Sequence, residues 1–449
     1  MIFIKKTLGK IGIDGAIAFT LLTRIIQAGG GIISIIFIAR FLSPSEQGYY
    51  YTFASILAIQ IFFELGLSGI ITQYTAYEFA HLTWGDNFAL LGEEYYKSRL
   101  SSLLRFCVKW FSIIAGFLFI TLLIAGFVFF NKYNKTLDVN WQKPWIILCL
   151  TTSLNLFIDP ILAFFDGLGE VKDMSKVRLI QKSFNIILLF IFFECGFKLY
   201  SSGLASLIAI IINYFQIIFS KRIKFLKAIW VGRAKWTINY YQEIFPFQWR
   251  IAISWISGYF IFQLFNPVLF ATEGAVVAGQ MGMTIAALTG ISSLSMSWIS
   301  TKVPFLSTLI SKKDYSSLDN NFKNIFTQSI GVNALLTLLF LLVIQIARHF
   351  NIQLANRFLV LIPLLCMCFA SIVNQVIFAL ATYLRCHKKE PLLIQSITMG
   401  ILVCASTFLL GKKFGLFGIT IGYFFLTCIV SLLWTIYIFF NKRKNWHHQ

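Results

Sequence analysis

The stretch from Ile11 to Ala80 decides the fold, because it holds two apolar runs separated by the polar turn Leu42-Ser43-Pro44-Ser45-Glu46-Gln47-Gly48. Each run is long enough to cross a hydrocarbon core of about 30 Å. The first run contains Arg24 and the second contains Glu64. A charge at the centre of a bilayer costs about 2.5 kcal/mol or more, so such residues usually face a wet cavity or a partner. We therefore expect two spanning helices that line a polar space.

Composition extends this expectation to the whole chain. Of the 449 residues, 58% are hydrophobic and only 12% are charged, against about 25% charged in soluble proteins. Apolar runs of spanning length recur and predict an all-α integral membrane protein with twelve transmembrane helices. The expected spans are roughly 14–38, 47–79, 106–130, 144–166, 179–198, 201–219, 246–270, 274–301, 325–347, 357–382, 391–411 and 415–440.

The net charge of +20 is explained by membrane topology. If the N-terminus is cytoplasmic, the cytoplasmic segments hold about three times as many Lys and Arg residues as the segments on the opposite side. This excess predicts that both termini lie in the cytoplasm, where the basic loops can contact anionic lipid headgroups. We therefore expect membrane lipids as partners and no nucleic acid.

The basic segment 220–245 is the largest loop and separates an N-terminal lobe, 1–219, from a C-terminal lobe, 246–449, each with six expected helices. Short motifs recur in the same order in both lobes, which predicts a parallel repeat about an axis along the membrane normal. The paired features are Arg24 with Arg250, Glu46 with Glu273, Gly48 with Gly279, Gln181 with Gln395, and 200–207 with 414–421.

Arg24 and Arg250 are the candidates for anion binding. A guanidinium stays charged and can make bidentate hydrogen bonds to phosphate or carboxylate. Two guanidinium groups at matching depth, facing each other across the interface of the lobes, would form an anion clamp. The alternative is that each arginine pairs with a carboxylate or extends to the headgroups.

Glu64 and Asp159 are the candidates for ion coupling, because a carboxylate removed from water binds a proton or cation more readily. For Asp159 the alternative is an ion pair with Arg24. Asp166, at a membrane edge, is expected to be solvated.

Gln73, Gln280 and Lys302 are further candidates, which could line a cavity and bind sugar or phosphate. The alternative is that they make interhelical hydrogen bonds, or that Lys302 extends to the headgroups. The region from His81 to Arg105 alternates aromatic and charged residues, which predicts an amphipathic helix at the membrane surface.

Enzyme signatures are missing from the sequence. It has no Walker A, GxSxG or HExxH motif, and its eight cysteines include no CxxC pair. We therefore expect no catalytic residues, no cofactor and no metal site.

Three stretches carry a resemblance to a known family: the residues Ala39-Arg40-Phe41-Leu42-Ser43-Pro44-Ser45-Glu46-Gln47-Gly48-Tyr49-Tyr50, the run Phe63-Glu64-Leu65-Gly66-Leu67, and Ile299-Ser300-Thr301-Lys302-Val303-Pro304. With the twelve expected spans, they resemble the O-antigen (Wzx-type) flippases, in the superfamily that includes the MATE drug transporters. The overall pattern covers the whole chain and the specific motifs about a tenth of it.

The resemblance implies a MATE-like MOP fold, with two lobes around a central cavity. It also implies a multi-pass protein of the bacterial inner membrane. Its substrate would be undecaprenyl-pyrophosphate-linked oligosaccharide of the O-antigen or another surface polysaccharide. Alternating access would move this lipid from the cytoplasmic to the periplasmic leaflet, with proton or sodium as coupling ion and an association with the polysaccharide polymerase machinery. In related flippases cationic cavity residues receive the pyrophosphate, in agreement with Arg24 and Arg250.

Two alternatives stay open. A MATE-type cation-coupled efflux transporter would share the fold, but its cavity should carry net acidic charge. A membrane enzyme such as an O-antigen polymerase would usually place catalytic residues on a large external loop, and the expected external loops are short.

Overall fold

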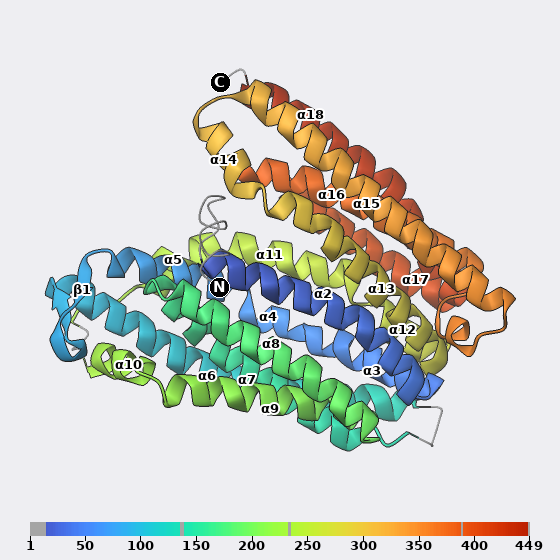
Figure 1. Cartoon of the computed structure of the whole chain (residues 1–449), viewed down its shortest axis with the longest axis horizontal. Coiled ribbons are helices and arrows are strands. Elements are labelled where there is room, and N and C mark those ends of the chain that lie inside the picture. The colour runs from blue at the N-terminus through green and yellow to red at the C-terminus, as the bar shows by residue number, and fades with distance from the viewer. Residues whose placement is uncertain (1–14, 135–138, 232–234, 388, 448–449) are drawn as a thin grey trace, which may run out of the picture. The chain divides into compact units, whose positions relative to one another are not determined.

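The computed structural model describes residues 15–134, 139–231, 235–387 and 389–447, and this part of the chain is mostly helical (Figure 1). Within it, nine helical stretches have the length and apolar composition of membrane spans, which makes the chain a multi-pass membrane protein. They are Pro44–Phe79, Glu94–Tyr133, Gln142–Gly167, Tyr200–Ile218, Ile251–Thr272, Ala275–Ser311, Tyr315–His349, Leu361–Cys386 and Leu393–His447. The expected number of twelve spans stays a prediction.

One reason for the different count is a kink. The expected spans 391–411 and 415–440 both fall within the stretch Leu393–His447, which has the non-helical dihedral angles φ 56° and ψ −135° at Gly415 and is divided there into two helical parts. Gly415 has φ 56°, which side chains rarely tolerate, and a Cβ there would collide with the Glu273 carboxylate.

The chain divides into two compact units. Unit 1 comprises the described residues up to Gly30 together with Leu57–Lys132 and Asn140–Ile256. Unit 2 comprises Gly31–Ile56, Tyr133–Val139 and the chain from Ser257 onward. The helices α2 (Gly15–Phe41) and α11 (Phe245–Phe262) contribute residues to both units. These two units are compact bodies and do not correspond to groups of six spans each. The predicted lobe boundaries at 219 and 246 stay a prediction.

Unit 1 is built around α7 (Gln142–Gly167), which packs against α5 (Leu67–Phe79), α8 (Val171–Glu194) and α9 (Tyr200–Ile218) (Figure 1). These segments form helices because a chain in lipid must satisfy its backbone hydrogen bonds within itself. The remaining elements of unit 1 are η1 (Ala58–Gln60), α4 (Ile61–Glu64), α6 (Glu94–Tyr133), α10 (Arg222–Val231) and η3 (Tyr240–Ile244).

The prediction of an amphipathic helix over His81–Arg105 is wrong for its first part. The chain forms an antiparallel hairpin of β1 (Leu82–Trp84) and β2 (Leu90–Gly92), joined through η2 (Asp86–Phe88), before α6 begins at Glu94. Gly92 has φ 131°, which stops a helix from continuing through this position. The ring of Trp84 lies 4.4 Å from that of Phe225, so the hairpin packs on α10.

Unit 2 is a bundle in which α13 (Ala275–Ser300), α15 (Tyr315–His349) and α16 (Leu361–Cys386) pack against one another (Figure 1). Its core includes the fully buried Leu318, Tyr383 and Leu384. The other elements are α3 (Pro44–Leu57), α12 (Phe265–Thr272), α14 (Val303–Ser311), η4 (Gln353–Arg357), α17 (Leu393–Phe425), η5 (Leu426–Ser431) and α18 (Leu432–His447).

The polar turn that opens α3 is shorter than expected, because the helix already begins at Pro44. Ser43 and Glu46 form a reciprocal cap: the Ser43 amide donates to the Glu46 carboxylate at 2.8 Å, and the Glu46 amide donates to the Ser43 hydroxyl at 3.1 Å. This capping box satisfies two backbone donors at the helix start.

Two glycines that the sequence pairs as repeat positions lie against each other in unit 2. A Cβ on Gly48 would lie 1.9 Å from the backbone oxygen of Ala275, and a Cβ on Gly279 would lie 2.8 Å from the Gly48 nitrogen. Gln47 is fully buried and donates to the Gly279 backbone oxygen at 2.8 Å. Both glycines are therefore needed for α3 and α13 to approach closely.

The paired glutamines also occupy comparable places. Gln181 on α8 is buried and accepts a hydrogen bond from Asn213 on α9 at 3.0 Å. Gln395 on α17 is buried and donates to Thr435 on α18 at 2.6 Å. Each amide thus joins the helix that carries it to a later helix of the same unit.

Candidate functional site

The second spanning segment is broken within unit 1. Helix α4 ends at Glu64, and Leu65 and Gly66 then adopt left-handed φ values of 49° and 71° before α5 begins. The Ser68 hydroxyl donates to the Glu64 carboxylate at 2.9 Å across this break. A Cβ on Gly66 would lie 2.6 Å from the Cγ2 atom of Ile251, so glycine fits both the conformation and the space. Discontinuous helices of this kind free polar groups at membrane depth.

Beside the break lies a polar cavity of about 590 Å³, lined from η1, α4, α5, α7 and α8. Both predicted ion-coupling residues, Glu64 and Asp159, line it, together with Asp166, Arg178 and Lys182. Glu64 is half-buried and the side chain of Asp159 is exposed to the open space. The structure therefore brings the two carboxylates to one cavity, while their coupling role stays a prediction.

The charges of this cavity are only partly paired. Arg178 makes a bidentate contact with Asp166, with distances of 3.2 and 2.6 Å to the two carboxylate oxygens. The expectation that Asp166 is merely solvated is therefore wrong. Asp159 and Lys182 make no hydrogen bond or ion pair with another side chain in the described part of the chain. Glu64, Asp159 and Lys182 thus lie in the cavity without an ion pair to another described residue. The positive charges of Lys182 and Arg178 still attract Asp159.

An amide network supports the wall of the cavity. Gln181 donates to Asn155 at 3.0 Å and accepts from Asn213, and Asn155 donates to the Thr151 backbone oxygen at 3.0 Å. From the sequence, Gln181 is predicted only as a repeat position, and Arg178 and Lys182 are not among the candidate residues. Their four-residue spacing, which puts two cations on one helix face, was the available signal.

This arrangement suits a proton or a monovalent cation. Two carboxylates, hydroxyls and amide oxygens offer hard oxygen ligands in a membrane protein's interior. Among the described residues, no group of three or more His, Cys, Asp or Glu side chains is placed to hold a metal ion. The exchange of a proton or a weakly held cation at this cavity stays a prediction.

The five predicted substrate-binding residues are distributed differently. Arg24 lies on α2 and Arg250 on α11, but their side chains lie outside the part of the chain that the structure describes. Gln73 is exposed on α5, and Lys302 is exposed just before α14. Gln280 donates to the Asn356 backbone oxygen at 2.9 Å, so its amide bonds another part of the chain, which was the alternative to ligand binding. Gln73, Gln280 and Lys302 do not line the unit 1 cavity, and the binding role of all five stays a prediction.

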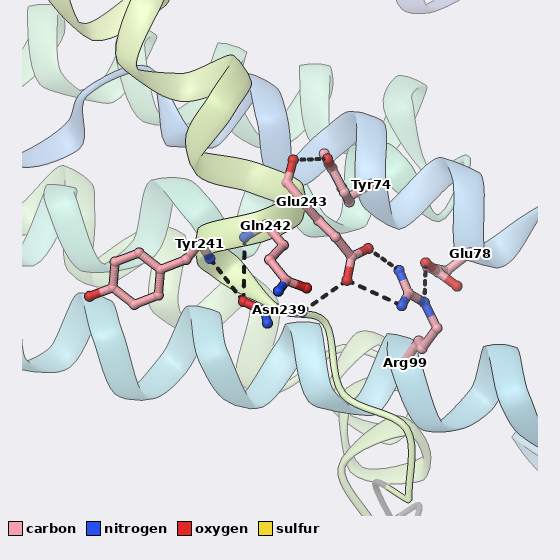
Figure 2. Close-up of polar contacts among 7 residues, drawn as sticks. All are labelled: Tyr74, Glu78, Arg99, Asn239, Tyr241, Gln242 and Glu243. Atoms are coloured by element: carbon pink, nitrogen blue, oxygen red, sulfur yellow. Dashed lines mark hydrogen bonds and ion pairs between the residues drawn. The ribbon is translucent and has the colours of Figure 1, made fainter.

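A second charged group in unit 1, which sequence reasoning missed, is centred on Arg99 of α6 (Figure 2). Its Nε donates to Glu78 of α5 at 2.8 Å, and its Nη2 donates to Glu243 of η3 at 2.5 Å. The Tyr74 hydroxyl donates to the Glu243 backbone oxygen at 2.6 Å, and the backbone N–H of Asn239 donates to the Glu243 carboxylate at 2.9 Å. We call these five residues the Arg99 cluster.

The Arg99 cluster joins the segment 240–244 to two spanning helices. Glu78 is only 1% exposed, and its Oε2 atom has no hydrogen-bond partner among the described residues. The hydrogen bond from Arg99 lowers the pKa of the Glu243 carboxyl below its ordinary value. The available sequence signal was Glu78 itself, an acid within the expected span 47–79.

No protein family model and no curated protein matches this sequence. Solved structures match almost the whole chain. A multidrug resistance MATE family transporter of the MOP superfamily, in an inward-facing conformation, matches with 14% identity and a TM-score of 0.60, over 96% of this chain and 98% of that one.

Two further structures match at similar coverage. The lipid II flippase MurJ, in an inward closed conformation, matches with 15% identity and a TM-score of 0.54, over 96% of this chain and 90% of its own. A MOP superfamily transporter from Pyrococcus furiosus, described as having a binding pocket of reverse polarity, matches with 13% identity and a TM-score of 0.52, over 95% of both chains. The chain therefore has the MATE-like MOP fold that its sequence predicts.

Proposed function

We propose that this protein is a flippase for undecaprenyl-pyrophosphate-linked oligosaccharide, an intermediate of O-antigen or other surface polysaccharide synthesis. It would work by alternating access in a bacterial inner membrane, with both termini in the cytoplasm, and would move the lipid to the periplasmic leaflet. Arg24 and Arg250 would hold the pyrophosphate. The proposal makes the protein a transporter and not an enzyme, and it leaves room for an association with polymerase machinery.

The observation that carries the proposal is the unit 1 cavity, where Glu64 and Asp159 lie beside a broken helix in a fold shared with transporters and a lipid flippase. Binding of a proton or sodium ion there would change the charge of the cavity between the two access states. An inside-negative potential also favours outward movement of anions, by about 2.3 kcal/mol per charge and 100 mV. Both sources could drive the pyrophosphate outward.

A MATE-type cation-coupled efflux transporter is the second candidate. It is favoured by the match to the multidrug resistance transporter and by the unpaired acids of the unit 1 cavity. The basic residues at positions 24 and 250 favour an anionic substrate instead, since a cationic drug would be repelled by two guanidinium groups. The flippase is therefore the preferred function.

The test is the leaflet distribution of lipid-linked oligosaccharide in cells that lack the protein, measured as access of a periplasmic lectin to the glycan in spheroplasts. We expect the glycan to accumulate in the cytoplasmic leaflet, and the wild-type chain to relieve this. Arg24→Ala and Arg250→Ala, at normal protein levels, should not relieve it. Arg385→Ala is the matched control, since this exposed arginine pairs with Glu390 five residues along the chain.

Undisturbed translocation without the protein would contradict the flippase and direct attention to drug export. Full relief by both arginine variants would keep the flippase and remove the clamp. These two results separate the activity from the residues assigned to it.

A further inference from the structure

Unit 2 contains a cavity whose chemistry differs from that of unit 1. It has a volume of about 420 Å³, within the range of small-molecule sites. It is lined from α12, α13, α16 and α17 and by the two residues Phe262 and Gln263 at the end of α11. In the part of the chain that the structure describes, no charged side chain lines it.

Three polar side chains of this cavity have no hydrogen-bond partner among the described residues. Gln263 lies at the interruption between α11 and α12, and Thr289 and Ser293 lie on α13. None of these three side chains makes a hydrogen bond with another described residue. Thr289 and Ser293 are exposed to the open space of the cavity and Gln263 is half-buried, so their amide and hydroxyl groups are accessible to a polar ligand.

Other polar groups form a fixed frame around these free ones. Asn374 donates to the Tyr423 hydroxyl at 2.8 Å, and the hydroxyls of Ser292 and Ser371 lie 3.2 Å apart. These bonds hold α13, α16 and α17 around the cavity. The chain's own hydrogen bonds therefore hold these three helices at the wall of the cavity.

Aromatic rings supply the apolar part of the wall. The rings of Phe265 and Tyr423 lie 5.0 Å apart, and those of Phe262 and Phe378 lie 6.2 Å apart. A pyranose has two faces of C–H groups, which pack on aromatic rings, and an edge of hydroxyls, which bonds amides and hydroxyls. A charged ligand would lose its hydration here without gaining an opposite charge.

We propose that this cavity binds a neutral sugar residue. The inference rests on the proposed function, to which it adds the place where the glycan end of the lipid-linked substrate is held. Gln263, Thr289 and Ser293 donate or accept hydrogen bonds with the sugar hydroxyls, while the aromatic rings cover a face of the ring. The site selects neutral sugars over cations and phosphates.

The test is saturation-transfer NMR of methyl glycosides of glucose, galactose and N-acetylglucosamine with the full-length protein in lipid nanodiscs. Detergents with sugar headgroups must be excluded, because they would occupy the site. We expect transfer to the ring C–H protons of at least one glycoside. The double variant Gln263→Leu/Ser293→Ala removes two ligand-facing groups without breaking an internal hydrogen bond, and it should weaken binding by about tenfold.

Gln328→Leu is the control, since this amide is exposed on α15 and does not line the cavity. Thr289→Val, which keeps the side-chain shape, should weaken binding by a smaller factor, and thermal unfolding verifies that each variant is folded. Glycoside transfer that is unchanged in both the double variant and Thr289→Val would overturn the inference. The inference would also be overturned if the flipping rate of the double variant depended on the concentration of lipid-linked glycan as the wild-type rate does. Glycoside binding by a chain that flips no lipid-linked glycan would overturn the proposed function and support the sugar site.

Discussion

Both units have a cavity beside a break in a spanning helix, but the side chains that line the two cavities differ in charge. In unit 1 the break at Leu65 and Gly66 adjoins a cavity lined by acids and bases, of which Glu64, Asp159 and Lys182 make no ion pair with another described residue. In unit 2 the break at Gln263 adjoins a cavity lined by neutral side chains alone, as far as the described residues show. Under the two proposals, the same structural feature would bind an ion in unit 1 and a neutral ligand in unit 2.

This difference implies that electrostatic changes should matter more in unit 1. A charge inside a membrane protein is kept only where something compensates it, so its removal or exposure has large effects. Neutral hydrogen bonds each contribute about 1 kcal/mol, so their removal has smaller effects. The predictions below compare matched positions of the two units, or of one unit, in decreasing order of effect.

The largest effect on stability is expected for the Arg99 cluster of unit 1. Arg99→Ala leaves the buried Glu78 carboxylate without its cation, and we expect a loss of about 3 kcal/mol in the free energy of unfolding. The comparison in unit 2 is Arg443→Ala, whose more exposed pair with Asp319 should be worth about 1 kcal/mol. Thermal unfolding of the purified variants measures both. Equal losses of unfolding free energy in the two variants would contradict the claim that burial of Glu78 makes the Arg99 ion pair the more important one.

A smaller effect is expected at the break beside the unit 1 cavity. Gly66→Ala forces a side chain into φ 71° and toward Ile251, so we expect a loss of about 1–2 kcal/mol. Gly116→Ala is the control, because it lies within α6 and a Cβ there meets no atom within 4 Å. Thermal unfolding of the two variants should therefore differ. A Gly66 variant as stable as the Gly116 variant would contradict the strained break.

The paired glutamines provide the third comparison. Gln181→Leu removes the partner of both Asn155 and Asn213, and we expect it to cost about 2 kcal/mol. Gln395→Leu should cost about 1 kcal/mol, because the Thr435 hydroxyl keeps its bond to the Ser431 backbone oxygen at 2.8 Å. Chemical unfolding in mild detergent can rank the two. A larger loss for Gln395→Leu would reverse the comparison.

The smallest effect concerns acid stability. Arg99 lowers the pKa of Glu243 in the folded chain, so this carboxyl binds its proton less readily folded than unfolded. Its contribution is therefore complete above the ordinary pKa of 4.5 and is lost as the pH falls through the lowered folded value. Between pH 6 and pH 3, the melting temperature of wild type should fall slightly more than that of Glu243→Gln. A parallel fall in both would contradict this contribution.

Much of the fold could be predicted from sequence, because apolar runs of spanning length leave few alternatives to helices. The glycines at 48 and 279 are predicted to be paired repeat positions, because each follows a turn that contains an acid. Their contact with each other could not be foreseen, since it depends on how α3 and α13 cross. The hairpin at 82–92 was missed because its strands have three residues each, too few for a periodic pattern.

The candidate site was predictable in its acids but not in its arrangement. Glu64 and Asp159 are conspicuous because an acid within an apolar run is costly. That they share one cavity, with Arg178 and Lys182 on its wall, depends on the packing of α5, α7 and α8. The positive-inside rule could not reveal the two cations, because it concerns only the side of the membrane and not the helix face.

The most direct test of the account uses purified protein in proteoliposomes that contain lipid-linked oligosaccharide, with an imposed proton or sodium gradient. The measured quantity is the initial rate of glycan movement between leaflets. For wild type we predict that one of the two gradients accelerates this rate, and that Glu64→Gln/Asp159→Asn abolishes the response. Glu94→Gln, an exposed acid at the start of α6, should respond like wild type. A double variant that responds to the gradient as wild type does would contradict the assignment of ion coupling to the unit 1 cavity.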